Sequence, residues 1–113
     1  MREVNVNVIP VQIAATVNSS AVPALNLFSC SVQIAATGAA AGTLVLQASN
    51  DETSVGYATV PTNWSNIPSA TVTVSGAGAY LIPKLDVCYQ FLRVSYTNTG
   101  TGTISVVLKA IGD

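Results

Sequence analysis

The stretch QFLRVSYTNTGTGTISVVLKA, residues 90–110, decides the fold class of this chain. Its first part alternates apolar and polar side chains, so that Leu92 and Val94 share one face of an extended segment. The glycine-rich NTGTG at 98–102 is typical of a tight turn, and the alternation resumes from Thr103 to Ala110. The pattern predicts a β-hairpin with one apolar face.

The rest of the chain has the same character. It contains 16 Val, 7 Ile and 12 Thr, residues that suit a pleated strand and crowd a helix. Turn signals recur about every 8–12 residues, which is typical of a sandwich or barrel. We therefore predict an all-β, single-domain antiparallel β-sandwich over residues 1–113, jelly-roll-like, with eight or nine strands.

Three segments carry more specific expectations. Residues 25–36 should form a long strand that turns Phe28, Cys30 and the next apolar residues of the same parity toward the core. Residues 55–60 should form a short strand. The segment PTNWSNIP, residues 61–68, should be a loop or crossover that carries the single Trp.

Charge is scarce in this sequence. Charged residues make up 8% of the chain, against about 25% in an ordinary soluble domain, and the formal net charge is −1. The four basic residues are scattered, so no patch for nucleic-acid phosphates is evident. A surface so poor in charge is weakly protected against association. A monomer covered by Ser, Thr and Asn is one interpretation; we favour a homo-oligomer, a trimer or larger.

The sequence also bears on where the protein resides. The N-terminal MREVNVNVIP lacks the apolar core of a signal peptide, and no stretch approaches the roughly 18 apolar residues of a membrane span. We therefore expect no membrane partner, and synthesis in a cytoplasm without a signal peptide.

Side chains for acid–base catalysis are few. The chain has no His, which excludes Ser–His–Asp and Cys–His arrangements. Asp51 and Glu52 are the one adjacent pair of carboxylates, and no DxDxDG spacing accompanies them, so a solvated turn explains them better than a calcium site. We predict no catalytic residue, no metal site and no cofactor, and hence no enzyme.

Cys30 and Cys88 are the two cysteines, and neither belongs to a CxxC pair that could bind zinc. The parity of Cys30 predicts a buried free thiol. A disulfide between the two is the alternative, which we favour less because disulfides are rare in a cytosol.

The aromatic residues are the best candidates for ligand contact. Trp64, Tyr57 and Tyr80, together with other tyrosines, could form a platform on which a sugar ring stacks. A surface glycan is then a candidate partner, and a carbohydrate-binding module or receptor-binding adhesin is the alternative function. Core packing is the more common use of a lone Trp.

Arg93 stands inside the otherwise apolar stretch FLRVSY. It could contact another subunit or pair with Asp86. It could equally face solvent, because one face of an antiparallel sheet is often exposed to water.

Four segments form a recognisable set: LVLQASND (44–51), NWSNI (63–67), GAGAYL (76–81) and CYQFLRVSYTNTGTGTISVVLKAIG (88–112). Together they resemble small virion-associated proteins encoded among the structural genes of tailed bacteriophages. The resemblance covers about 65 residues, and its motifs outline strands and loops rather than chemistry. It implies a non-catalytic structural protein of the virion that assembles with itself and with other virion proteins. Head decoration or stabilisation and a tail-associated role are both open.

Overall fold

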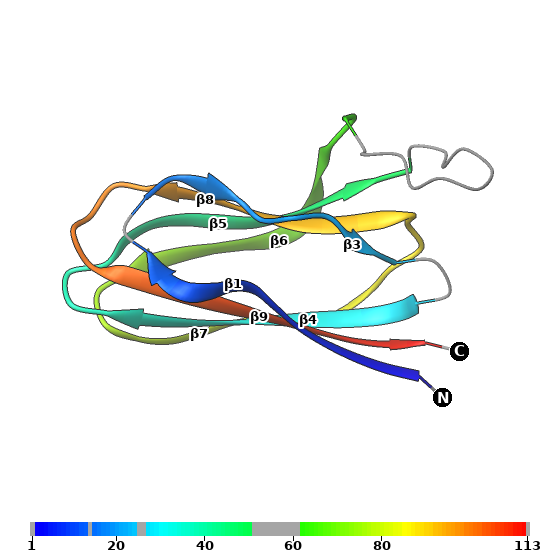
Figure 1. The fold of residues 1–113 in the computed structure, drawn as a ribbon, viewed down its shortest axis with the longest axis horizontal. Coiled ribbons are helices and arrows are strands. Elements are labelled where there is room, and N and C mark those ends of the chain that lie inside the picture. Colours follow the sequence, from blue (N-terminus) through cyan, green and yellow to red (C-terminus); the bar gives the residue numbers. More distant parts are fainter. Residues whose placement is uncertain (1, 14, 25–26, 51–61, 113) are drawn as a thin grey trace.

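The computed structural model describes residues 2–13, 15–24, 27–50 and 62–112 (Figure 1). Within these residues there is no helix long and apolar enough to cross a membrane. The strands are β1 (Arg2–Ile13), β2 (Val17–Asn18), β3 (Val22–Pro23), β4 (Leu27–Thr37), β5 (Ala41–Ser49), β6 (Ser65–Ser75), β7 (Gly78–Asp86), β8 (Phe91–Asn98) and β9 (Thr103–Gly112).

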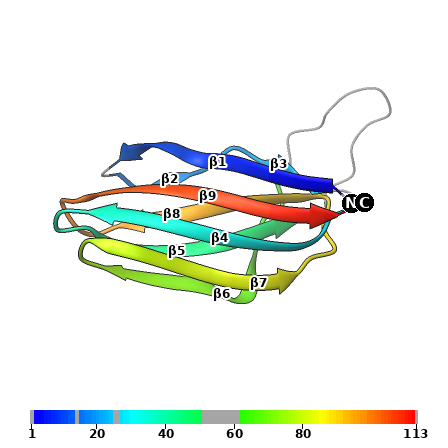
Figure 2. The same ribbon diagram turned by 90° about the horizontal axis from the view of Figure 1, so that it is seen from below.

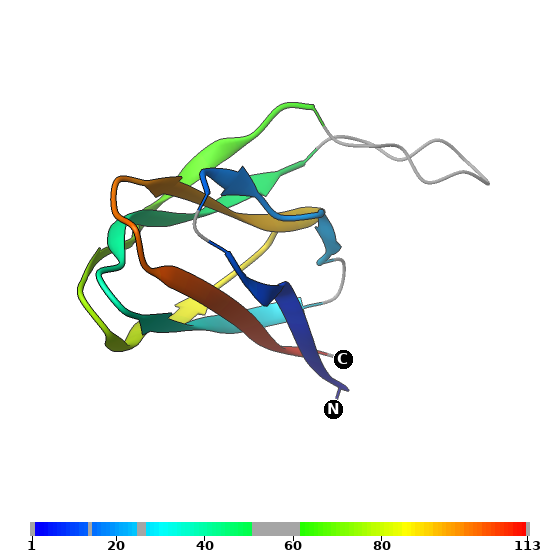
Figure 3. The same ribbon diagram turned by 60° about the vertical axis from the view of Figure 1, so that its left-hand side comes forward.

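The strands form two antiparallel sheets that pack face to face (Figures 1 and 3). Sheet A has the order β1-β9-β4-β7, and sheet B has the order β2-β8-β5-β6, with β3 also paired to β8. The pairing is nested along the sequence, because strands near the two chain ends pair with each other and strands near the middle pair with each other. The pairs are β1 with β9, β2 and β3 with β8, β4 with β7, and β5 with β6. This nested pairing, rolled into two sheets, is a jelly roll, and it confirms the predicted sandwich.

The core fills the space between the two sheets with alternate residues from each strand. The predicted hairpin supplies a large share of it, because β8 and β9 occupy interior positions in sheet B and sheet A respectively. Tyr96 is the largest of the fully buried side chains, and its hydroxyl donates a hydrogen bond to the Ala41 carbonyl oxygen at 3.1 Å. The other large residues that are almost completely buried include Ile34, Leu44, Leu46, Ile82, Leu92, Ile104 and Leu108.

Two local expectations are wrong. Phe28 is half exposed although its parity matches that of the core residues, because the β4–β9 register shifts between Leu27 and Ser29 and reverses the alternation there. The segment Ser65–Pro68 belongs to strand β6 rather than to a loop. The predicted strand at 55–60 lies outside the described residues.

A large bulge in β6 explains why the sequence hides this strand. Between the pairs Val45–Thr71 and Gln47–Asn66, the chain advances two residues along β5 and five along β6. Ser69 adopts a positive φ of 64° within this bulge, an unusual conformation for a residue with a side chain. The bulge turns Ile67 inward, where it is buried in the core.

Three turns meet at one end of the sandwich: β4–β5, β6–β7 and β8–β9 (Figure 1). The Ala40 and Ala41 carbonyl oxygens of the first turn accept hydrogen bonds from the Gly76 and Thr99 N–H groups, at 2.7 and 2.8 Å. Gly102 lies so close to the backbone of the first turn that a Cβ there would overlap the Ala40 nitrogen. The chain termini lie at the opposite end, where β1 and β9 run side by side (Figure 2).

Candidate functional site

A line of polar side chains crosses the outer face of sheet B near the end that lies away from the three turns. Gln47 of β5 lies opposite Arg93 of β8 on one side and opposite Asn66 of β6 on the other. The Arg93 Nε group donates a hydrogen bond to Gln47 Oε1 at 2.8 Å, and Gln47 Nε2 donates to Asn66 Oδ1, also at 2.8 Å. Cross-strand register therefore creates a connected polar network from residues distant in sequence.

The direction of this network is fixed by its chemistry. A guanidinium N–H can only donate, so the Gln47 atom that faces Arg93 must be the amide oxygen. The Gln47 nitrogen must then face Asn66, and Asn66 must accept through its own oxygen. The remaining amide group of Asn66, its Nδ2, is a donor.

Trp64 and Arg93, two of the predicted site residues, are brought together. The guanidinium carbon of Arg93 lies 4.4 Å from the centroid of the Trp64 ring, which is a cation–π contact. Burial lowers the pKa of Arg93 from its ordinary value. The arginine thus has two partners within its own chain, on the β5 side and the Trp64 side.

The proposed pairing of Arg93 with Asp86 is wrong. Asp86 lies at the end of β7 in sheet A, where it is opposite Ser29, whereas Arg93 belongs to sheet B. The ion pair seen in the described part of the chain joins Lys109 to Glu3 at 3.5 Å, with both side chains more than half exposed. Such a pair contributes little to stability.

The structure separates Tyr80 from Trp64. Tyr80 lies on β7 beside the β6–β7 turn, where its hydroxyl accepts a hydrogen bond from the Ser75 N–H at 3.1 Å and donates one to the Gly76 carbonyl oxygen at 3.0 Å. Its role there is to hold the turn. Tyr57 lies outside the described residues.

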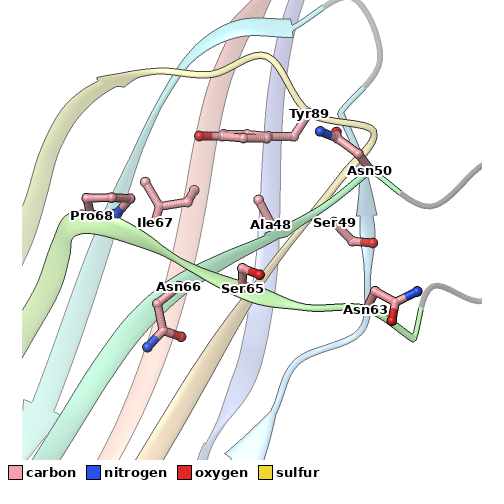
Figure 4. A pocket seen from close by; sticks show the side chains of 9 residues that line it. All are labelled: Ala48, Ser49, Asn50, Asn63, Ser65, Asn66, Ile67, Pro68 and Tyr89. Atoms are coloured by element: carbon pink, nitrogen blue, oxygen red, sulfur yellow. The ribbon is translucent and has the colours of Figure 1, made fainter.

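A pocket of about 320 Å³ lies between the end of β5 and the start of β6, beside the bulge (Figure 4). Ala48, Ile67 and Pro68 are its aliphatic lining residues, and the Tyr89 ring lies across the pocket from Ile67 and Ala48. Its polar side is formed by side-chain amides and hydroxyls, those of Ser49, Asn50, Asn63, Ser65 and Asn66. Trp64 sits between two of these residues in the sequence, so the pocket and the Arg93–Trp64 contact adjoin each other.

The outer faces of the two sheets differ in character. Among the side chains whose burial is described, the exposed large apolar ones are Phe28, Leu81 and Val107, and each belongs to a strand of sheet A. Leu81 and Val107 flank Gln33 in one cross-strand row. The corresponding row on sheet B is Thr73, Thr43 and Thr97, all exposed. The outer face of sheet A is therefore partly apolar, whereas that of sheet B carries hydroxyls in this row and the Arg93, Gln47 and Asn66 side chains further along.

The cysteines are both free, with Cys30 buried and Cys88 exposed. The prediction of a buried thiol at Cys30 is confirmed. Burial raises the pKa of the Cys30 thiol to about 11, so it stays protonated and unreactive at neutral pH.

The sequence alone did not single out Gln47, Asn66 or Asn50. The first two are polar positions within alternating strands, and only the strand order places them beside Arg93. Tyr89 was considered with the other tyrosines, and the structure places it over the pocket. The useful signal was the pair of amide-rich segments QASN (47–50) and NWSN (63–66), which flank the pocket.

Comparisons with known proteins agree on the fold. The sequence matches no protein-family model and no curated protein. The solved structure of the SPBc2 prophage-derived protein YomS is similar with a TM-score of 0.63 and 9% identity, over 96% of this chain and 92% of that one. The structure of PirA is similar with a TM-score of 0.53 and 18% identity, over 93% and 90% of the two chains. Identities this low show a shared fold and nothing more.

Proposed function

We propose that this protein is a non-catalytic structural component of a bacteriophage particle, which assembles with copies of itself through the outer face of sheet A. Head decoration or stabilisation, or attachment at the tail, would both use such a part. The observation that carries the proposal is that the exposed large apolar side chains Phe28, Leu81 and Val107 all belong to sheet A, with Leu81 and Val107 in one cross-strand row.

Physical chemistry supports self-association through this face. Burying an exposed Leu or Val side chain contributes about 1.5–3 kcal/mol each when water is excluded. Repulsion between copies is weak because the net charge is only −1 and 8% of residues are charged. The Ala35 and Ala79 pair next to the Gln33 row is also exposed, and side chains this small let another surface approach closely.

The virion assignment draws on two further observations. The sequence segments from residue 44 to 112 resemble virion-associated proteins of tailed phages. The jelly roll is an architecture that viral capsid proteins use, although lectin domains use it too.

Replacing Leu81 and Val107 together by Asp tests the assembly surface. We expect the wild-type protein to hold a fixed mass of three or more subunits across a dilution series in light scattering, and the double variant to dissociate. The matched control is Thr73→Asp with Thr97→Asp, which places the same charges on the equivalent row of sheet B. A wild-type monomer of 11.5 kDa, or equal dissociation in both variants, would contradict the assembly surface.

An antibody raised against the purified protein tests the virion role separately. Co-sedimentation of the protein with purified phage particles is the expected result, and immunogold microscopy would then place it on the head or the tail. Its absence from particles would overturn the assignment even if the protein is an oligomer.

A further inference from the structure

The pocket beside the β6 bulge combines an apolar wall with a rim of hydrogen-bonding groups, and the described residues that line it are all uncharged. Its volume of about 320 Å³ is at the lower end of the range for small-molecule sites, roughly 300–1,000 Å³. It is therefore sized for one small ligand.

One polar group of the pocket has a defined orientation. The Gln90 backbone N–H, which can only donate, gives a hydrogen bond to Asn50 Oδ1 at 3.0 Å. The Asn50 amide is thereby fixed with its oxygen engaged and its Nδ2 as the remaining donor. In Figure 4 this nitrogen is turned toward the ring of Tyr89.

The apolar wall faces this donor. Ile67 and Ala48 are both buried, and the Tyr89 ring lies across the pocket from them (Figure 4). An aromatic ring with aliphatic side chains opposite it forms a slot that suits a flat apolar surface. Ser65 adds a hydroxyl, which can both donate and accept.

From this combination we infer that the pocket binds one uncharged sugar residue. The C–H face of the sugar would pack on Tyr89 and Ile67, and its hydroxyls would bond to Asn50 and Ser65. A purely apolar ligand would cover the Asn50 Nδ2 donor and the Ser65 hydroxyl without bonding to them, which is costly. An anion would meet no cation among the described lining residues, because Arg93 is engaged by Gln47 and Trp64 at the outer face.

This site differs from the platform expected from the sequence. One face of the Trp64 ring is covered by Arg93, and Trp64 is not among the lining residues. Tyr89, rather than Trp64 or Tyr80, supplies the aromatic surface. Trp64 lies between Asn63 and Ser65, so its fluorescence should report occupancy of the pocket.

The inference does not depend on the proposed function. A particle protein can carry a sugar site, and a sugar-binding protein need not belong to a particle. Failure of either experiment leaves the other standing.

The test is a titration of the purified protein with glucose, galactose, mannose and N-acetylglucosamine, each supplied separately at millimolar concentration. Two readouts are followed: the emission of Trp64, the only Trp in the chain, and the NMR signal of the Asn50 side-chain amide. We expect saturable changes in both readouts with at least one of these sugars. Glucose 6-phosphate and N-acetylneuraminic acid serve as charged counterparts.

Two variants make the test specific. Asn50→Asp keeps an oxygen for the Gln90 N–H but replaces the donor with a charge, and it should weaken binding about tenfold or more. Tyr89→Ala removes the ring and should abolish binding, whereas Tyr89→Phe should retain most of it. Asn18→Asp makes the same chemical change on β2, outside the pocket lining, and should bind as the wild type does.

Each contrary outcome is decisive. No saturable change with any neutral sugar would overturn the site. Preference for the charged sugars would overturn its neutral character. Equal binding by Asn50→Asp and Asn18→Asp, with melting temperatures that show both are folded, would place the ligand elsewhere.

Discussion

The guanidinium carbon of Arg93 lies over the Trp64 ring, 4.4 Å from its centroid, while the Arg93 Nε group donates a hydrogen bond to Gln47. One side chain thus joins strands β8 and β5 to the residue just before β6. The contact links the three strands that surround the pocket end of sheet B.

Arg93→Ala should lower the free energy of unfolding by about 1–2 kcal/mol. The substitution removes the cation–π contact with Trp64 and the hydrogen bond that the charged guanidinium donates to Gln47. Arg93→Lys should lose about half as much, since it keeps the cation but lacks the Nε donor. Urea unfolding followed by Trp64 fluorescence measures both values. Lys84→Ala, an exposed site, is the control, and an equal loss there would contradict the structural role.

The same variants separate a structural arginine from an interface arginine. Because Arg93 lies on the outer face of sheet B and the proposed contact lies on sheet A, we expect Arg93→Ala to keep the wild-type mass in light scattering. A reduced mass would instead support the hypothesis that Arg93 contacts another subunit.

Stability should fall as pH rises through the range where Cys30 titrates. The pKa of the Cys30 thiol is 9.0 in the unfolded chain and about 11 in the folded protein. Between pH 9 and pH 11 the unfolded state therefore binds fewer protons than the folded state. The free energy of unfolding then declines by up to about 1.4 kcal/mol per pH unit, and the full contribution is present below pH 9.

Cys30→Val should flatten this decline, and Cys88→Ser, at an exposed thiol, should leave it unchanged. Some slope will persist above pH 10, because burial also raises the pKa of Tyr96. Urea titrations at a series of pH values provide the measurement. An unaltered pH profile in Cys30→Val would contradict the assignment.

Ser69→Gly should raise the free energy of unfolding by about 0.5–1 kcal/mol. A side chain at a φ of 64° costs roughly 1–2 kcal/mol, and glycine removes that cost while losing some chain entropy. Ser95→Gly, in the regular part of β8, should instead lower stability by about 0.5–1 kcal/mol. Thermal unfolding of the two variants measures both changes in stability. A loss of stability in Ser69→Gly as well as in Ser95→Gly would show that the bulge is unstrained.

Gly102→Ala should lower stability by several kcal/mol or prevent folding. The added Cβ would overlap backbone atoms of the β4–β5 turn, and backbone yields far less easily than a flexible side chain. Thr101→Ala, at the exposed neighbouring position, should change stability by less than about 0.5 kcal/mol. Circular dichroism melts compare the two, and similar melting temperatures would contradict the close approach of the turns.

Sequence patterns predicted what depends on local alternation. Strands β8 and β9 and the turn between them follow directly from the residues at 90–110, and Cys30 is buried as its parity predicts. The alternation failed at bulges. A register shift reverses the inward assignment of Phe28, and the larger bulge of β6 hides the strand that contains Ile67.

The candidate site was less predictable, because it depends on strand order. Trp64 was identified as the single Trp and Arg93 as a charge within an apolar stretch, but nothing local indicates that Gln47 lies between β8 and β6. Tyr80 was grouped with Trp64 although the jelly roll places it beside the turns at the other end. Pairing across the nested fold joins Gln47 to Asn66, 19 positions away, and to Arg93, 46 positions away, and no short window of sequence records either contact.

The two faces of this sandwich differ, and the difference limits how many copies can assemble through one of them. When two copies use the same patch in the same way, the contact closes on itself and growth stops at a pair. An assembly of three or more copies through the Leu81 and Val107 face therefore requires a second, different patch, and the margin of sheet A at β1 is positioned to provide one. The number of copies in solution would then report how many distinct surfaces each molecule uses.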